Sequence, residues 1–300
     1  MMFFEPNLNE INKLIQMNSL KIEIINFQVM SGTTNGLVLL LESEQGNKYV
    51  LKFDHPSEIN LAVRLLKAYQ SSELLSRIVF VAPDESYFIY SYLEGTTHFN
   101  RGSKKNWLTK LVVELFNKYT IHKSENEWGR LGYPRASWKD FNETSIAEAK
   151  SNIGHVLTKE DFEFVSSQIA KLFDAGYIGE QYLLHGDTGV HNFVFNQSTL
   201  IGVIDPSPML APLIYDFVYA FCSSPDDINL ETLFTAYDFL EQGTVDKSRL
   251  IDEVSIQLYC RIGLSIKHHP NDLPEYLRAW SHWRGICTQL EAGINTILTK

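Results

Sequence analysis

One stretch in the second half of the chain constrains the fold more than any other. It reads HGDTGVHN at residues 185–192, continues through two short apolar segments at 193–195 and 200–204, and ends on Asp205. Aromatic and β-branched residues favour strands, and the polar residues 196–199 between the segments favour a turn. The stretch therefore predicts a polar loop that leads into a β-hairpin.

The pairing of this hairpin determines how far apart its oxygen-bearing side chains lie. If Phe195 faces Leu200, then Asn192 lies opposite Val203. Asp205 follows two positions along, so its Cβ atom is expected roughly 7–8 Å from that of Asn192, a diagonal cross-strand distance. One metal ion could span that gap.

The spacing H-x-D-x-x-x-x-N, followed by a strand and a second acid, is the layout that kinases use for phosphoryl transfer. In this interpretation Asp187 orients the attacking hydroxyl, while the oxygens of Asn192 and Asp205 hold Mg²⁺, a hard cation that prefers such ligands. Each residue alone also fits a simpler role in a loop or turn, and only the combined spacing favours a kinase. His191 stays unassigned, because Mg²⁺ sites rarely use imidazole.

These residues resemble the aminoglycoside phosphotransferase family, small-molecule kinases with a bilobal protein-kinase-like fold. The resemblance covers roughly residues 20 to 225. It implies an α+β fold, with a small β-rich N-lobe (1–92) that binds nucleotide and a larger, mainly helical C-lobe (93–300) that carries the catalytic loop and the substrate-binding helices. It also implies that Asp187 is the catalytic acid and that Asn192 and Asp205 are magnesium ligands.

The resemblance further implies a nucleotide site in the first part of the chain. Lys52 is similar to the strand lysine that contacts the α- and β-phosphates, and Glu58, which opens an amphipathic helix pattern, is similar to its ion-pair partner. An exposed strand lysine and an acid in a helix's first turn would fit the same pattern. The segment with Ser31 and Thr33 lies where the family places its loop over the triphosphate, although a glycine-rich hairpin turn explains it almost as well.

Other family landmarks follow along the chain. The segment IYSYLEG at 89–95 is similar to the hinge whose main chain binds adenine, and Ser91 and Leu93 would supply those groups. Asp216 matches the acid that braces the catalytic loop, with His185 beside it in support. Asp205 is followed by proline rather than by the Phe-Gly of protein kinases, so a regulatory flip of this segment is not expected.

Composition narrows the class of protein. With 300 residues and 44% hydrophobic content the chain can bury a large core, and apolar stripes predict helices near residues 58–69, 108–119, 230–240 and 250–266. A net charge of −10 argues against a nucleic-acid partner. No basic leader or membrane-length apolar run is present, and three scattered cysteines indicate buried thiols, so a cytoplasmic protein without a membrane partner is expected.

The leading hypothesis is transfer of the γ-phosphate of ATP or GTP, with Mg²⁺, to a hydroxyl of a small molecule by a monomer or homodimer. An aminoglycoside-type antibiotic is the first acceptor to consider. The acids that could meet its ammonium groups are Glu125, Glu127, Asp140, Glu143, Asp272 and Glu275, and no spacing singles one out. The alternatives are a metabolite kinase of the same fold (fructosamine, homoserine or choline type), a non-catalytic nucleotide-binding sensor, and a metal-dependent hydrolase using His185, Asp187 and Asp205.

Overall fold

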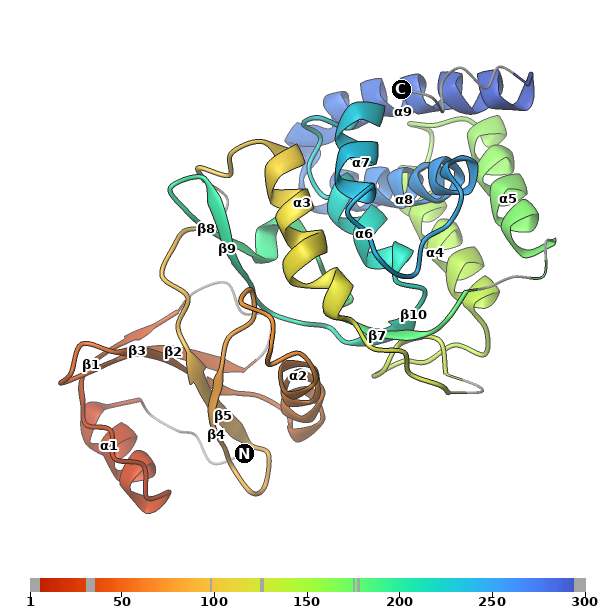
Figure 1. Ribbon diagram of the computed structural model, residues 1–300. Coiled ribbons are helices and arrows are strands. Elements are labelled where there is room, and N and C mark those ends of the chain that lie inside the picture. The colour runs from red at the N-terminus through yellow and green to blue at the C-terminus, as the bar shows by residue number, and fades with distance from the viewer. Residues whose placement is uncertain are drawn as a thin grey trace. The chain divides into compact units, whose positions relative to one another are not determined.

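The computed structural model describes residues 6–30, 36–97, 99–124, 127–174, 176 and 179–293. Contacts divide the chain into two compact units, Met1–Gln70 with Leu75–Glu94, and Ser71–Leu74 with Gly95–Lys300. The first unit is built on an antiparallel sheet and the second mainly on helices (Figure 1), which confirms the α+β prediction.

The first unit is a five-stranded antiparallel sheet with two helices. Its strands are β1 (Ile24–Val29), β2 (Leu37–Ser43), β3 (Lys48–Phe53), β4 (Ile78–Val81) and β5 (Tyr87–Ser91), in the order β1-β2-β3-β5-β4. Leu39, Leu51 and Ile89 lie directly opposite one another across β2, β3 and β5, and all three are buried. Helix α1 (Leu8–Met17) places Ile11 and Ile15 in the same core, so one face of the sheet is covered by a helix.

Helix α2 (Pro56–Ala68) follows β3 after a short connection. Pro56 at its first position suits a helix start because proline has no N–H to leave unpaired. The helix buries Ile59, Leu65 and Leu66, and leaves Glu58 exposed in the first turn. The helix predicted near residues 58–69 is therefore confirmed.

The second unit contains two small β elements, and these position its loops. One is a three-stranded sheet in the order β6-β10-β7, and the other is the hairpin of β8 and β9. The strands are β6 (Gly129–Arg130), β7 (Tyr182–Leu184), β8 (Phe193–Asn196), β9 (Thr199–Val203) and β10 (Met209–Ala211). The helices are α3 (Lys104–Glu114), α4 (Trp138–Ile153), α5 (Lys159–Asp174), α6 (Ile214–Cys222), α7 (Leu230–Tyr237), α8 (Lys247–His268) and α9 (Leu273–Glu291), with single turns η1 (Phe116–Lys118), η2 (Val190–Asn192) and η3 (Pro270–Asp272).

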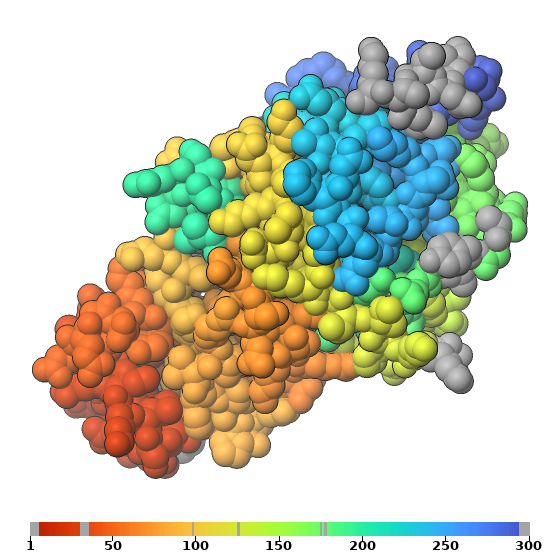
Figure 2. Space-filling model, viewed as in Figure 1, coloured from red at the N-terminus to blue at the C-terminus, as the bar shows by residue number. Residues whose placement is uncertain are grey.

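Two helix contacts organise this unit. Helix α3 lies against α7, and their side chains form a continuous surface in Figure 2, where α3 is yellow and α7 is blue. Helix α8 crosses α4 at Gly263, where an added Cβ atom would lie 2.9 Å from the Cα atom of Ala149. The missing side chain lets the two helices approach closely.

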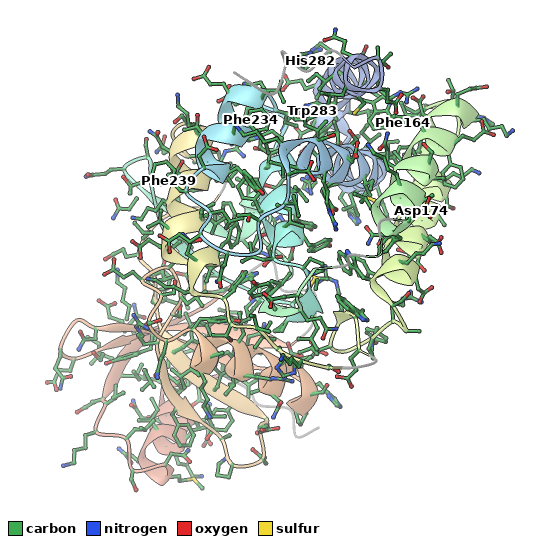
Figure 3. The ribbon with its side chains drawn as sticks, turned by 45° about the vertical axis from the view of Figure 1, so that its right-hand side comes forward. Phe164, Asp174, Phe234, Phe239, His282 and Trp283 are labelled. Carbon is green, nitrogen blue, oxygen red and sulfur yellow. The ribbon has the colours of Figure 1, made fainter. Side chains whose placement is uncertain are left out.

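Helix α9 packs its aromatic residues into the core. Tyr276, Trp280 and Trp283 are buried, and the Trp283 indole N–H donates to the Ile228 carbonyl at 3.1 Å. Figure 3 labels Trp283 beside His282, which is exposed on the same helix. The aromatic residues of α9 are therefore core residues rather than a binding box.

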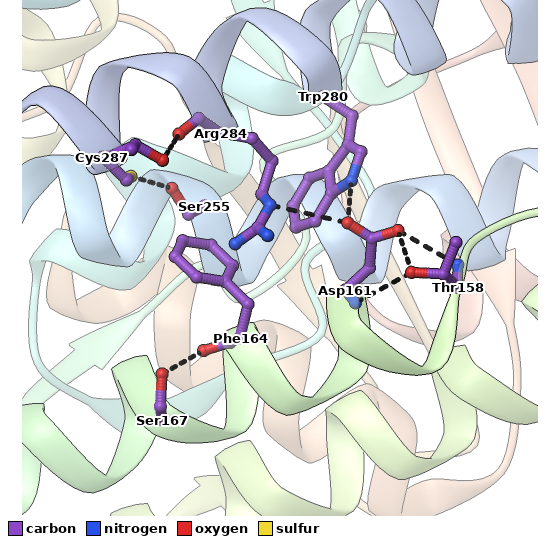
Figure 4. A network of polar contacts seen from close by, with 9 residues as sticks. Thr158, Asp161, Phe164, Ser167, Ser255, Trp280, Arg284 and Cys287 are labelled. Atoms are coloured by element: carbon purple, nitrogen blue, oxygen red, sulfur yellow. Dashed lines mark hydrogen bonds and ion pairs between the residues drawn. The ribbon is translucent and has the colours of Figure 1, made fainter.

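A polar network joins the start of α5 to α9 (Figure 4). The Thr158 hydroxyl accepts the Asp161 N–H at 3.3 Å and the Asp161 carboxylate accepts the Thr158 N–H at 3.0 Å, which is a reciprocal cap. The same carboxylate accepts from the Trp280 indole at 2.9 Å and lies 3.5 Å from Arg284 Nε. The guanidinium of Arg284 stacks 3.8 Å from the ring centre of Phe164.

The three cysteines are free thiols, and Cys222 and Cys287 are buried. Across the described ranges, no helix combines the length and the apolar character that crossing a bilayer requires.

Candidate functional site

The hairpin of β8 and β9 forms as predicted, but its register shifts by one residue. Its tight turn places Gln197 and Ser198 at φ +47° and +64°, the left-handed values of a two-residue hairpin loop. Phe195 faces Leu200, and a bulge then pairs Val194 with Gly202 and Phe193 with Val203. The prediction that Asn192 faces Val203 is therefore wrong, because the bulge inserts one residue into β9.

The shifted register moves Asn192 next to Ile204. The Ile204 N–H donates to the Asn192 carbonyl at 2.9 Å, so Asp205 comes one position after this contact rather than two. Asp205 itself has φ +51°, a left-handed value that is rare for a residue with a side chain. The local backbone is held in this unusual conformation directly beside Asn192.

Three side chains hold the carboxylate of Asp187. The Asn192 amide donates to Oδ2 at 2.9 Å and also to the Asp187 carbonyl at 3.0 Å. The Tyr219 hydroxyl donates to Oδ1 at 3.0 Å, and His191 Nε2 lies 3.5 Å from Oδ2. An ionised carboxylate has about four acceptor sites, so these contacts fix its direction and still leave room for another donor.

The charge of Asp187 is stabilised. Burial alone would raise its pKa, but the hydrogen bond and charge of His191, with the charges of His185 and Arg130, lower it to about 2. Asp187 is therefore an anion throughout the neutral range.

A buried acid on α6 fixes the backbone of the loop at residues 185–192. The Gly186 N–H donates to both carboxylate oxygens of Asp216 at 3.2 Å. The Tyr119 hydroxyl donates to Asp216 at 2.7 Å and accepts the His185 N–H at 3.1 Å, while the Thr188 hydroxyl donates to the Asp216 carbonyl at 2.9 Å. Burial raises the pKa of Asp216 to about 6, and the donors around it partly offset that rise.

Helix α6 is fixed at its other end by Lys104, which is fully buried. Its ammonium group donates to the carbonyls of Phe221 and Ser224 at 2.9 and 2.7 Å, at the C-terminal end of the helix. A cation is favourable there because the last carbonyls of a helix lack partners and carry partial negative charge.

The segment after Asp205 is hydrogen-bonded to the loop at residues 185–192. The Ser207 N–H donates to the His185 carbonyl at 3.0 Å, and Arg130 donates to the Ser207 carbonyl at 3.1 Å. Gly186 has φ +78°, and a Cβ atom there would lie 2.1 Å from the Ser207 carbonyl oxygen. Only glycine fits this close approach.

The burial of His185 predicts a pH dependence of stability. Burial lowers its pKa from 6.5 to about 4, against the raising effect of the Asp187 and Asp205 charges. The unfolded chain therefore binds the extra proton first, and the free energy of unfolding contributed by neutral His185 is lost as pH falls from 6.5 to 4. One proton corresponds to a slope of about 1.4 kcal/mol per pH unit.

Chemical unfolding of His185→Asn at a series of pH values is expected to lack this slope. Asp216 contributes a slope of opposite sign over part of the range, so the comparison is between variant and wild type. The control is His282→Asn on the exposed side of α9, which should keep the wild-type profile. Equal profiles for wild type and His185→Asn would contradict the prediction.

The structure describes the residues that are expected to bind nucleotide less completely than those around Asp187. Lys52 Nζ lies 3.9 Å from the Asp54 carboxylate, a neighbour that the sequence interpretation missed, and the pairing with Glu58 stays a prediction. Ser31 and Thr33 lie outside the described residues. The Ser91 N–H donates to the Arg77 carbonyl at 2.9 Å, so this amide is already used.

Leu93 lies in the irregular segment that follows β5, just before the chain leaves the first unit after Glu94. Its main-chain groups therefore stand outside the regular sheet.

Tyr219, Tyr119 and Arg130 are site residues that the sequence interpretation missed. Tyr219 lies three residues after Asp216, which places both on one face of a helix. That spacing was the available signal for Tyr219. Tyr119 and Arg130 come from distant segments and carry no comparable signal.

One cavity of about 390 Å³ borders the loop of residues 185–192 at His191. We call it the acidic cavity, because Asp226, Asp272 and Glu275 line it together with two arginines, Arg101 and Arg261. Within the described ranges, the hydroxyl of Ser224 and Nδ1 of His191 are buried in its lining without a hydrogen-bond partner. Unpaired buried polar atoms of this kind are costly, which suits a site that a ligand completes.

Of the acids suggested by the sequence, Asp272 and Glu275 line the acidic cavity, whereas Glu127, Asp140 and Glu143 do not. Glu125 lies outside the described residues. The hydrolase hypothesis requires a cluster of metal-binding side chains. In the part of the chain that the structure describes, no group of three or more His, Cys, Asp or Glu side chains is arranged to hold a metal ion.

Comparison with solved structures identifies the fold. APH(2″)-IIIa in complex with GDP and kanamycin matches with a TM-score of 0.60 and 15% identity, over 93% of this chain and 99% of that chain. ADP-bound APH(2″)-Ib matches with a TM-score of 0.56 and 17% identity, over 93% and 99%. A candidate fructosamine-3-kinase from Thermobifida fusca matches with a TM-score of 0.57 and 12% identity, over 90% and 98%.

A comparison with curated proteins found no match. The sequence profile of the phosphotransferase enzyme family matches residues 28–246, which is most of the chain and includes the whole loop and hairpin described above. The kinase-like fold and this match together show that the chain belongs to the phosphotransferase enzyme family of aminoglycoside phosphotransferases and their relatives.

Proposed function

We propose that the protein transfers the γ-phosphoryl group of ATP or GTP to a hydroxyl of a small molecule, and that Asp187 orients that hydroxyl. The observation that carries the proposal is the ionised Asp187 carboxylate, held by Tyr219 and Asn192 with an acceptor site to spare. In the reaction the acceptor oxygen bonds to the γ-phosphorus, the bond to the β-phosphate oxygen breaks, and the hydroxyl proton passes to Asp187. A carboxylate with so low a pKa is a weak base, so it takes the proton only as the new O–P bond forms.

The residues beside Asp187 fit a divalent cation. The Asn192 amide nitrogen is used by Asp187, which leaves the Asn192 oxygen as the atom that could bind a metal, with the Asp205 carboxylate next along the hairpin. Amide and carboxylate oxygens are the ligands that Mg²⁺ prefers. Bound Mg²⁺ would neutralise charge on the phosphate oxygens.

We assign nucleotide binding to the first unit. Lys52 would contact the phosphates with Glu58 or Asp54 as its acid, and Leu93 would contact the base with Ser91 beside it. Ser31 and Thr33 would cover the phosphates. Similar folds with GDP or ADP bound support a nucleotide co-substrate.

The acidic cavity supports a cationic acceptor, with an aminoglycoside-type antibiotic as the leading candidate. Asp272 and Glu275 offer carboxylates to ammonium groups, and the cavity reaches Asp187 through His191. A relative of the same fold binds kanamycin. A metabolite kinase is the second candidate, because a candidate fructosamine-3-kinase has a similar fold, with a TM-score of 0.57.

A panel assay tests the proposal. The whole chain is incubated with Mg²⁺, ATP or GTP, and aminoglycosides, fructosamines, homoserine or choline, and release of nucleoside diphosphate is measured. Acceptor-dependent release that is absent without Mg²⁺ is the expected result. Nucleotide binding without release for any acceptor would favour a non-catalytic sensor.

Tyr219→Phe is expected to lower kcat about tenfold and leave KM for the nucleotide unchanged. The variant removes one hydrogen bond to a charged carboxylate, worth about 1.5–3 kcal/mol, while the ring keeps its packing. Steady-state kinetics with the acceptor found in the panel measures the effect. The matched control is Tyr182→Phe, which removes a hydroxyl that donates to the Glu180 carboxylate at 3.1 Å instead; equal kcat losses in both variants would contradict a role specific to Tyr219.

A further inference from the structure

A second cavity of about 340 Å³ lies within the helical unit, between α4, α6 and α8. We call it the arginine cavity, because Arg130 and Arg135 line it and Glu148, an exposed residue, is the acid in its lining. It shares no lining residue with the acidic cavity. Its lining contains more arginines than acids, whereas the lining of the acidic cavity contains more acids than arginines.

The two arginines have guanidinium donors to spare. Arg130 donates one N–H to the Ser207 carbonyl, and among the residues described no other side-chain bond or ion pair is found for it. Arg135 is half-buried, and within the same residues its guanidinium has no ion-pair or hydrogen-bond partner. A guanidinium carries five N–H donors and matches carboxylate and phosphate groups in pairs, so this arrangement favours an anion.

Gln257 adds an independent sign of a ligand. The residue is only 7% exposed and lines the cavity from α8. Its amide makes no hydrogen bond within the described part of the chain, so its donors and its acceptor are available to a molecule in the cavity. The ring faces of Phe141 and Tyr215, packed edge to face at 5.6 Å, supply an apolar wall.

We propose that the arginine cavity binds a small molecule that carries a carboxylate or a phosphate group. Arg130 and Arg135 pair with the anionic group, the Gln257 amide bonds a polar group of the same molecule, and the apolar wall holds its remainder. Tyr219 lines this cavity and donates to Asp187 Oδ1, so a bound molecule lies one side chain away from Asp187. The site goes beyond the proposed function, because that function places the acceptor in the acidic cavity.

Isothermal titration calorimetry with the full chain tests the proposal, with Mg-ADP present to fill the nucleotide site. Inorganic phosphate is titrated in one series and benzoate in another, which distinguishes a preference for phosphate from one for an aromatic carboxylate. Saturable binding of at least one probe is expected. Arg135→Gln should weaken it about tenfold or more, equivalent to about 1.4 kcal/mol, and Arg135→Lys, which keeps the charge, should weaken it less.

The matched control is Arg101→Gln, which removes a guanidinium from the acidic cavity and should leave the affinity unchanged. Thermal melting of every variant shows whether it is folded. Absence of binding for both probes overturns the proposal, as does unchanged binding in a folded Arg135→Gln. Calorimetry measures binding of the two probes, whereas the panel assay measures phosphotransfer. A negative result in one experiment is therefore distinct from a negative result in the other.

Discussion

Replacing Asp187 by asparagine is expected to lower phosphotransfer about a thousandfold, within the 10²–10⁴ range of general acid–base effects. The amide has nearly the same size as the carboxylate and can still accept from Tyr219 or Asn192. It is neutral, however, and cannot take the proton of an acceptor hydroxyl. The loss should therefore appear in kcat, while the dissociation constant for Mg-nucleotide stays close to that of wild type.

Release of nucleoside diphosphate measures kcat, and displacement of a fluorescent nucleotide measures binding. Asp174→Asn is the matched control, because this acid at the end of α5 is exposed (Figure 3). Turnover above a tenth of the wild-type rate in Asp187→Asn would remove Asp187 from the catalytic role.

Gly186→Ala is expected to destabilise the chain by about 4 kcal/mol, at the upper end of single-substitution effects. Left-handed backbone costs alanine about 1–2 kcal/mol. The remainder comes from the Cβ atom, which would lie 2.1 Å from a backbone carbonyl oxygen that is itself held by Arg130. Thermal unfolding should shift down by roughly 10 °C.

Gly46→Ala separates the two causes. Gly46 has the same φ of +78°, but no heavy atom lies within 4 Å of its added Cβ. Gly46→Ala should lower the free energy of unfolding only by the cost of a left-handed backbone for alanine, about 1–2 kcal/mol. Equal losses at the two glycines would show that the contact between Gly186 and Ser207 does not constrain the loop.

Much of the fold was predictable because its signals are local. The hairpin of residues 193–203 follows from strand formers on both sides of a polar turn, and α2 follows from the apolar stripe that begins near Glu58. Helix α1 was not predicted, although its signals are local too: Asn7 caps its first turn, and Leu8, Ile11 and Ile15 repeat at helical spacing.

The candidate site likewise contains residues that the sequence predicted and residues that it did not. Asp187, Asn192 and Asp205 belong to one short motif, so spacing alone was enough to predict a shared site, and the structure shows the contact between Asp187 and Asn192. Gly202, beside the bulge in β9, was the available marker, because an isolated glycine in a strand often indicates a bulge, and the sequence interpretation missed it. Tyr219 and Arg130 reach the site from distant segments, and their contacts depend on tertiary packing that the sequence pattern does not encode.

The backbone on both sides of Asp205 is held by hydrogen bonds, and this has a consequence for inhibitor discovery. Three hydrogen bonds hold Ile204 and Ser207 on either side of it: the N–H groups of Ile204 and Ser207 donate to the carbonyls of Asn192 and His185, and Arg130 donates to the Ser207 carbonyl. Rotation of Asp205 would break these hydrogen bonds, and each contributes about 1 kcal/mol net. A compound that binds only the rotated form would therefore lose roughly 3 kcal/mol of binding free energy, which is more than a hundredfold in affinity. Screening against this chain should therefore favour compounds shaped to the resting conformation.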